Sequence, residues 1–264
     1  MLGKLTKYEL RATARNFLPL YIGILAFSLI GRSFFQVDFN NEALYTISKI
    51  GITGYISIII ATFVVTLVVL VQRFYKNLLC DEGYLMHTLP VKPWQNIGAK
   101  LCGVIVWSIA TLIVVVLSIF VMIVDTAFLE DGIRVLKGFM QHLITPNGLN
   151  TIGLMIEGIV VLFTQMIATI LMIYVSLAIG NLFHKNRVGA AALAFICIFF
   201  VLNVIANILM LFGNIIPVWE FINSLSMEAL MHCFFLTGIV INVTLCVIYF
   251  AVTNHILKRH LNLQ

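Results

Sequence analysis

Long apolar blocks alternate with short polar segments along almost the whole chain. The apolar blocks cover approximately residues 17–35, 50–71, 97–124, 152–183, 188–212 and 230–257. An apolar run of about 20 residues is long enough to cross the hydrocarbon core of a bilayer as an α-helix. The pattern therefore predicts six transmembrane helices separated by short connections.

The apolar blocks are continuous runs of Leu, Ile, Val and Phe, without the two-residue alternation of a membrane β-barrel. Composition supports this interpretation: 61% of the residues are hydrophobic and 10% are charged, and the mean hydropathy is +1.07. Soluble domains are about 45–50% apolar and about 25% charged. We therefore expect an all-α, multi-pass membrane protein forming a single transmembrane domain over residues 1–264.

Residues 2–16, ahead of the first span, form an amphipathic pattern. Spacings of three and four place Lys4, Lys7, Arg11 and Arg15 in one stripe, while apolar residues on the broader opposite side are interrupted by Glu9. Such a helix suits the headgroup layer. We expect an elbow helix that frames the span at 17–35; the alternative is a positive flank that only fixes orientation.

The distribution of basic residues predicts the topology. The formal net charge is +5, but the basic residues lie at the ends of apolar blocks, so they indicate membrane topology and no nucleic-acid partner. With both termini in the cytosol, basic residues accumulate on the inner side, as they do in plasma-membrane proteins. The inner residues are Lys4, Lys7, Arg11, Arg15, Arg73, Lys76, Lys92, Lys100, Lys185, Arg187, Lys258 and Arg259; the outer ones are Arg32, Lys49, Arg134 and Lys137.

Residues 72–100 form the only long polar and basic segment in the first half of the chain. Asp81 is a candidate N-cap and Glu82 lies in the first turn of a short predicted helix that Pro90 ends. Leu85 and Leu89 share one face of it, with Tyr84 beside them. Exposed apolar residues on a short capped helix indicate a docking surface; the alternative is a loop whose charges only set topology. Pro93 is predicted to begin the next helix.

Two further connections have recognisable patterns. In the outer loop at 125–148, apolar residues recur with helical spacing, which predicts a short amphipathic helix on the outer surface. Residues 184–187, His-Lys-Asn-Arg, form a tight basic turn on the cytosolic side.

Motifs for enzymatic chemistry are missing from the sequence. The chain has no GxxxxGK[ST] phosphate loop, no HExxH and no GxSxG. The spans contain almost no charge, which argues against an ion-coupled carrier. Glu157 is the exception: it could bind a cationic part of a substrate, or lie at the headgroup level without a function. Asn203 and Asn207 share a helix face; they could line a substrate path or bond to a neighbouring helix.

The layout and two stretches of sequence resemble a known family. An N-terminal MLGKLTKYELRATARNFLPLY, six spans and a first cytosolic loop of the form YKNLLCDEGYLMHTLPVKPWQ are similar to the ABC-2 type permease subunits of ABC transporters from Gram-positive, clostridia-like bacteria. Within that family, the small single-domain type is similar to exporters of phenol-soluble modulins and antimicrobial peptides.

The resemblance implies a division of labour between subunits. The loop between the second and third spans would be a coupling helix in a groove of a separate cytosolic ATPase, and His184, Lys185 and Arg187 would form a weaker second contact. Two ATPase copies would serve a homodimer of permeases. This chain would bind no cofactor and would not be an enzyme, because ATP and Mg²⁺ would belong to the partner. The implied coupling-helix contacts are Asp81, Glu82, Tyr84, Leu85 and Leu89.

Other functions remain open from the sequence. A permease of the same architecture could move lipids, drugs or a lantibiotic in place of amphipathic peptides. A membrane protein without transport activity, such as a sensor or an assembly factor, is a different class. That class would need neither an ATPase partner nor a docking helix.

Overall fold

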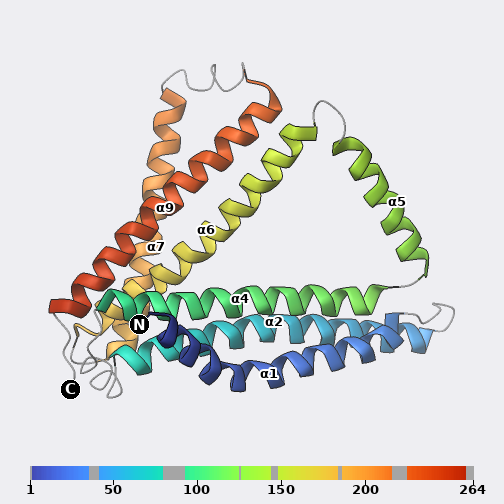
Figure 1. Cartoon of the computed structure of the whole chain (residues 1–264), viewed down its shortest axis with the longest axis horizontal. Helices are drawn as coiled ribbons and strands as arrows, with labels where there is room; N and C mark the ends of the chain where they lie inside the picture. The colour runs from blue at the N-terminus through green and yellow to red at the C-terminus, as the bar shows by residue number, and fades with distance from the viewer. Residues whose placement is uncertain are drawn as a thin grey trace. The chain divides into compact units, whose positions relative to one another are not determined.

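The computed structural model describes residues 2–35, 42–79, 93–124, 126–143, 148–183, 186–215 and 225–259. All regular structure within these ranges is α-helical (Figure 1). The helices are α1 (Leu2–Phe35), α2 (Glu42–Leu79), α4 (Pro93–Ile123), α5 (Thr126–Leu143), α6 (Gly148–Gly180), α7 (Arg187–Ile215) and α9 (Met227–Arg259).

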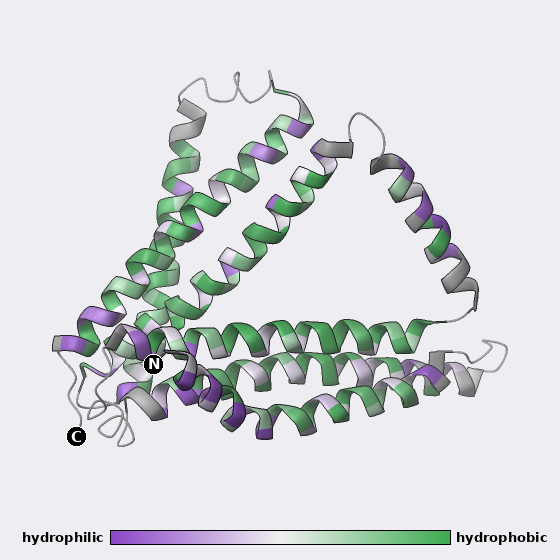
Figure 2. Ribbon diagram, in the orientation of Figure 1, coloured by the Kyte–Doolittle hydropathy of each residue, from purple (hydrophilic) through white to green (hydrophobic). Residues whose placement is uncertain are grey.

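Every helix except α5 is long and apolar enough to cross a membrane, which makes six candidate spans among the described residues. Hydrophobic residues cover most of each of these helices in Figure 2. The six predicted spans are therefore confirmed as helices. Each helix begins before its expected start, whereas α4 and α6 end one and three residues before their expected ends. The chain is a multi-pass membrane protein.

The N-terminal region differs from expectation in one respect. Residues 2–16 and 17–35 were expected to form an elbow helix and a separate span, but they form the single helix α1. Pro19 lies inside this helix, and α1 is visibly bent (Figure 1). Proline removes one backbone hydrogen bond and bends a helix without necessarily ending it, which is why the amphipathic and apolar parts remain continuous.

The predicted start of α4 is confirmed. α2 continues past its apolar block to Leu79, and α4 begins at Pro93, where proline is tolerated because the first helical N–H has no partner in the helix. The amphipathic helix expected in the outer loop is α5, which begins at Thr126. Its coloured residues in Figure 2 include both hydrophilic and hydrophobic ones.

The chain divides into two compact units, of which the first comprises Met1–Arg73 and Gln95–Phe139. Within it, Tyr21 and Thr66 both bond to Thr111 of α4. Contacts such as Tyr21 with Thr111 and Gly31 with Met122 advance together along α1 and α4, so these two helices are parallel. Contacts of α2 run the opposite way along α4, as expected for consecutive spans.

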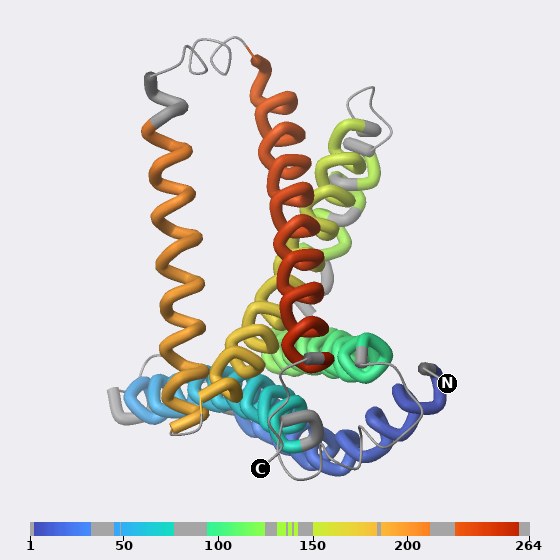
Figure 3. Tube along the Cα trace, turned by 90° about the vertical axis from the view of Figure 1, so that its left-hand side faces the viewer, coloured from blue at the N-terminus to red at the C-terminus, as the bar shows by residue number. Residues whose placement is uncertain are grey.

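The second unit comprises Phe74–Trp94 and Met140–Gln264. In it, α6 packs against both α9 and α7. Residues in contact advance together along α6 and α9, so these helices are parallel, whereas α7 returns from the end of α6 in the opposite direction (Figure 3).

Candidate functional site

The predicted docking residues lie outside the described part of the chain. This applies to Asp81, Glu82, Tyr84, Leu85 and Leu89, and also to His184 and Lys185. What the structure does describe is the pair of helices on either side of the first set. α2 ends at Leu79 and α4 begins at Pro93, so the structure describes both helices that flank this segment.

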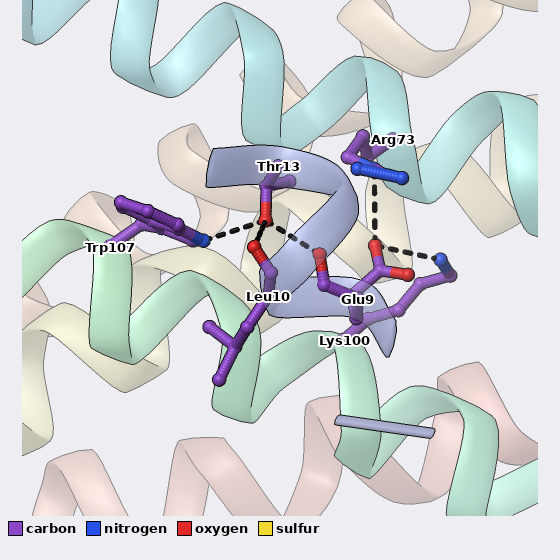
Figure 4. Close-up of polar contacts among 6 residues, drawn as sticks. All are labelled: Glu9, Leu10, Thr13, Arg73, Lys100 and Trp107. Atoms are coloured by element: carbon purple, nitrogen blue, oxygen red, sulfur yellow. Dashed lines mark hydrogen bonds and ion pairs between the residues drawn. The ribbon is translucent and has the colours of Figure 1, made fainter. Parts of the chain in front are cut away.

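A cluster of three charged side chains joins these two helices to α1. Glu9 Oε1 of α1 forms an ion pair with Arg73 Nε of α2 at 3.2 Å. The same oxygen accepts a hydrogen bond from Lys100 Nζ of α4 at 3.3 Å. Figure 4 shows Glu9 between the two basic side chains. The exposed fractions of the side chains are 13% for Glu9, 23% for Arg73 and 6% for Lys100. We refer to Glu9, Arg73 and Lys100 as the Glu9 cluster.

The Glu9 cluster lies close to the connection between α2 and α4. Arg73 is six residues before the end of α2 and Lys100 is seven after the start of α4, which at 1.5 Å per residue is about 9–11 Å along each helix. Charges removed from water are costly unless they are paired. The carboxylate therefore ties the two helices to each other and to α1 at this level.

A second group of contacts continues along the same faces of α1 and α4. Trp107 donates from Nε1 to Thr13 Oγ1 at 2.7 Å, and Thr13 Oγ1 donates to the backbone oxygens of Glu9 and Leu10 (Figure 4). The Trp107 ring also stacks on Phe17, with the centroids 4.6 Å apart. One turn further, the hydroxyls of Tyr21 and Thr111 are 2.8 Å apart.

The faces of α1 explain why its sequence is amphipathic. The basic stripe of Lys4, Lys7, Arg11 and Arg15 is exposed. The opposite face is half-buried at Glu9 and buried further along the helix, at Thr13, Phe17, Tyr21 and Ile24. The sequence pattern correctly places Glu9 on the face of the helix opposite the basic stripe, but there it looks like a mere interruption of the apolar residues. A lone carboxylate on an otherwise apolar face, with unassigned basic residues near the same membrane level, was the signal that could have found the cluster.

In the second unit, Glu157 is paired within the chain. Its Oε2 lies 2.8 Å from Nδ1 of His232 on α9. The exposed fractions of the two side chains are 22% and 30%. The sequence did not predict this pairing: it left Glu157 either as a residue that binds a cationic group or as one without a function. A cationic substrate group at Glu157 would therefore compete with His232.

The Glu157–His232 pair belongs to a longer series of polar contacts. Asn150, Glu157 and Thr164 are seven residues apart on α6 and so lie on one face. Asn150 Nδ2 donates to Glu228 Oε2 at 3.2 Å, and Asn242 Nδ2 lies 3.5 Å from Thr164 Oγ1. These three contacts, which we call the α6–α9 ladder, fix the register of the two parallel helices.

Asn203 and Asn207 lie on an exposed face of α7. Each amide nitrogen donates to the carbonyl four residues earlier, Asn203 to Phe199 at 2.8 Å and Asn207 to Asn203 at 2.7 Å. Only Asn203 is among the residues that line a pocket of about 470 Å³ between α6, α7 and α9. Of the three residues suggested for a substrate path, Glu157 and Asn207 are not among those that line this pocket.

The described residues on either side of the connection between α6 and α7 allow a close approach of the two helices. Asn186 has a left-handed backbone with φ of 63°, a conformation that asparagine tolerates, and its carbonyl accepts from Ala190. Arg187 is the first residue of α7. A Cβ at Gly180 would lie 2.5 Å from the backbone nitrogen of Ala191, so glycine is what allows the two helices to approach so closely.

The described residues contain no group of three or more His, Cys, Asp or Glu that could hold a metal ion. The comparisons with protein-family models, curated proteins and solved structures found no match to this chain.

Proposed function

We propose that this chain is the membrane permease subunit of an ATP-driven exporter of the ABC-2 type. In this proposal a separate cytosolic ATPase, present in two copies, binds the connection between α2 and α4. Two copies of the permease form a homodimer in the plasma membrane with their termini in the cytosol. ATP and Mg²⁺ bind to the ATPase, and this chain contributes no catalytic residue.

The observation that carries the proposal is the Glu9 cluster. Arg73 and Lys100 are on the two helices that flank the connection, and one carboxylate oxygen holds both. A displacement of the connection would therefore move α2 and α4 as a pair and draw α1 with them. A connection that only joined two spans would not require a largely buried ion cluster near its base.

The proposed mechanism follows from this arrangement. When the ATPase subunits close, the segment at 81–89 is displaced as a rigid lever, with Glu82, Tyr84, Leu85 and Leu89 as its contacts. The Glu9 cluster transmits the displacement to three spans. The spans then switch from an inward-open to an outward-directed arrangement, and cargo from the cytosol or inner leaflet is expelled.

The proposed cargo is an amphipathic or hydrophobic peptide, such as a toxin or an antimicrobial peptide. Almost uncharged spans support this class over ions or highly charged metabolites, because a charged cargo needs compensating charge within the membrane. Glu157, an acidic residue within a span, already has His232 as its partner.

The test is a pull-down of the tagged full-length chain from its native host in mild detergent, with partners identified by mass spectrometry. We expect recovery of an ATPase subunit, and its loss from the double variant Leu85→Asp/Leu89→Asp. A control variant must not disturb membrane insertion, which excludes exposed positions within spans such as Leu162 and Leu209. The better control is Lys4→Ala/Lys7→Ala on the exposed stripe, which should retain the ATPase.

Two results would overturn the proposal. One is recovery of the intact wild-type chain with no ATPase, which would favour a sensor or an assembly factor. The other is normal insertion and undiminished ATPase binding by the Leu85→Asp/Leu89→Asp variant. If an ATPase is recovered, stimulation of its hydrolysis by peptide, lipid, drug or lantibiotic identifies the class of cargo.

A further inference from the structure

A pocket of about 470 Å³ lies between three helices of the second unit, with lining residues from α6, α7 and α9. Its volume is within the range of about 300–1,000 Å³ that is typical of ligand sites. The close approach of Gly180 to Ala191 brings α7 against the end of α6. Away from this contact the lining comes from α9 as well, through Leu245 and Tyr249.

The pocket is at the middle of the candidate spans. Gln165 is the central residue of the span at Asn150–Gly180, and Phe199 is the central residue of the span at Arg187–Leu211. Leu245 is within one turn of the centre of Met227–Lys258. A ligand in the pocket would therefore lie near the midplane of the bilayer, where unpaired polar groups are costly.

The lining combines apolar side chains with a few uncharged polar groups. Gln165 and Asn203 supply two carboxamides, from α6 and α7, and Thr169 and Tyr249 supply hydroxyls. The Asn203 amide donates to the Phe199 carbonyl at 2.8 Å, which leaves its acceptor oxygen available. Tyr249 is only 7% exposed, and its hydroxyl has no hydrogen-bond partner.

We propose that this pocket binds an uncharged, apolar segment of a peptide, with Gln165 and Asn203 hydrogen-bonding to its backbone amides. A carboxamide presents a donor and an acceptor, as a peptide group does. An acyl chain would offer no partner to the Gln165 carboxamide or to the acceptor oxygen of Asn203 in the bilayer core. The lining contains no charged side chain, so charged residues of the peptide lie outside the pocket. The choice of cargo class rests on the proposed export function.

The experiment measures photolabelling of the purified full chain in phosphatidylcholine nanodiscs, without any ATPase. The first probe is a short peptide of alanine and leucine, capped at both ends and carrying one photo-leucine. The second probe is a phosphatidylcholine with a diazirine on one acyl chain. Labelled residues are identified by mass spectrometry, and unlabelled capped peptide is the competitor.

The expected result is labelling of the stretch at 195–206 by the peptide probe, suppressed by the competitor. Gln165→Leu/Asn203→Leu should reduce this labelling on the order of tenfold, because two hydrogen bonds are lost. The matched control is Asn207→Leu, which removes the same residue type one turn further along α7 from an exposed position outside the pocket lining, and it should retain wild-type labelling. Labelling by the lipid probe should not change in either variant.

Three results would overturn the inference. The first is peptide labelling that the double variant does not reduce. The second is equal labelling by the lipid probe that unlabelled peptide fails to compete, which would assign the pocket to acyl chains. The third is crosslinking between two chains through photo-leucine incorporated at Leu202, with no peptide labelling, which would assign this face to a second copy. Since the assay contains no ATPase, its outcome is independent of the pull-down that tests the export function.

Discussion

Trp107 donates a hydrogen bond to Thr13 across the interface of α1 and α4, with 2.7 Å between indole Nε1 and hydroxyl Oγ1. Thr13 is 2% exposed, and its hydroxyl in turn donates to the Glu9 carbonyl at 2.6 Å. The residue that forms the ion cluster near the connection is thus also held through its backbone. A single face of α1 combines an ion cluster, a hydrogen bond and an aromatic stack against α4.

Replacing the Glu9 carboxylate should destabilise the first unit. In Glu9→Gln, the largely buried Arg73 and Lys100 lose the carboxylate that they share, and removing one member of a buried pair typically costs about 3–5 kcal/mol. We expect a clear loss of thermal stability in detergent. The control is Asp131→Asn, which breaks an exposed pair with Arg134 and should cost less than about 1 kcal/mol. Equal effects of the two substitutions would contradict a structural role for the cluster.

The Trp107–Thr13 hydrogen bond should appear as a coupling energy. Trp107→Phe removes the indole donor but retains a ring against Phe17, and Thr13→Val removes the acceptor with little change in volume. A double-mutant cycle of unfolding free energies should give a coupling of about 0.5–1.5 kcal/mol. Strict additivity of the two substitutions would show that the bond contributes nothing.

Glu157 and His232 should likewise be coupled. Interhelical hydrogen bonds within membranes are worth about 0.6 kcal/mol on average and about 1.7 at most. A cycle of Glu157→Gln and His232→Gln, followed by thermal unfolding in detergent, should fall in this range. Glu228→Gln, at the exposed end of the α6–α9 ladder, is the control and should have a smaller effect. If Glu157 instead served a cationic substrate, export would fall in Glu157→Gln without any coupling to His232.

Gly180 should tolerate no side chain. An added Cβ would lie 2.5 Å from the Ala191 nitrogen, so Gly180→Ala must separate α6 from α7 and lower the melting temperature. Gly54→Ala is the matched control, because its Cβ would meet nothing within 4 Å and alanine favours a helix by about 1 kcal/mol over glycine. A melting temperature for Gly180→Ala equal to that of Gly54→Ala would rule out the close approach.

The six spans, the amphipathic α5 and the start of α4 at Pro93 were predictable because each depends on a local pattern. Hydropathy sets the spans, helical spacing sets α5, and proline chemistry sets the start of α4. The continuity of α1 was not predicted, since a proline within a helix and a proline at its start look alike in sequence.

The pairs that build the candidate sites were beyond the sequence for a different reason. Glu9 and Lys100 are separated by 91 residues, and Glu157 and His232 by 75. Hydropathy places each of them near a span end but does not say which helices adjoin. The heptad spacing of Asn150, Glu157 and Thr164 was visible in the sequence, but its partners on α9 are not equally spaced, so only the packed helices show the ladder.

The α6–α9 ladder limits how these two helices can move. Its three contacts differ in chemistry: a carboxamide with a carboxylate, a carboxylate with an imidazole, and a hydroxyl with a carboxamide. Sliding one helix by a turn would break all three at once and set unlike groups against each other. Separation from one end breaks them one at a time. The two helices can therefore separate progressively from one end. A conformational change that reaches this pair should separate α6 from α9 in this way, without translating one helix along the other.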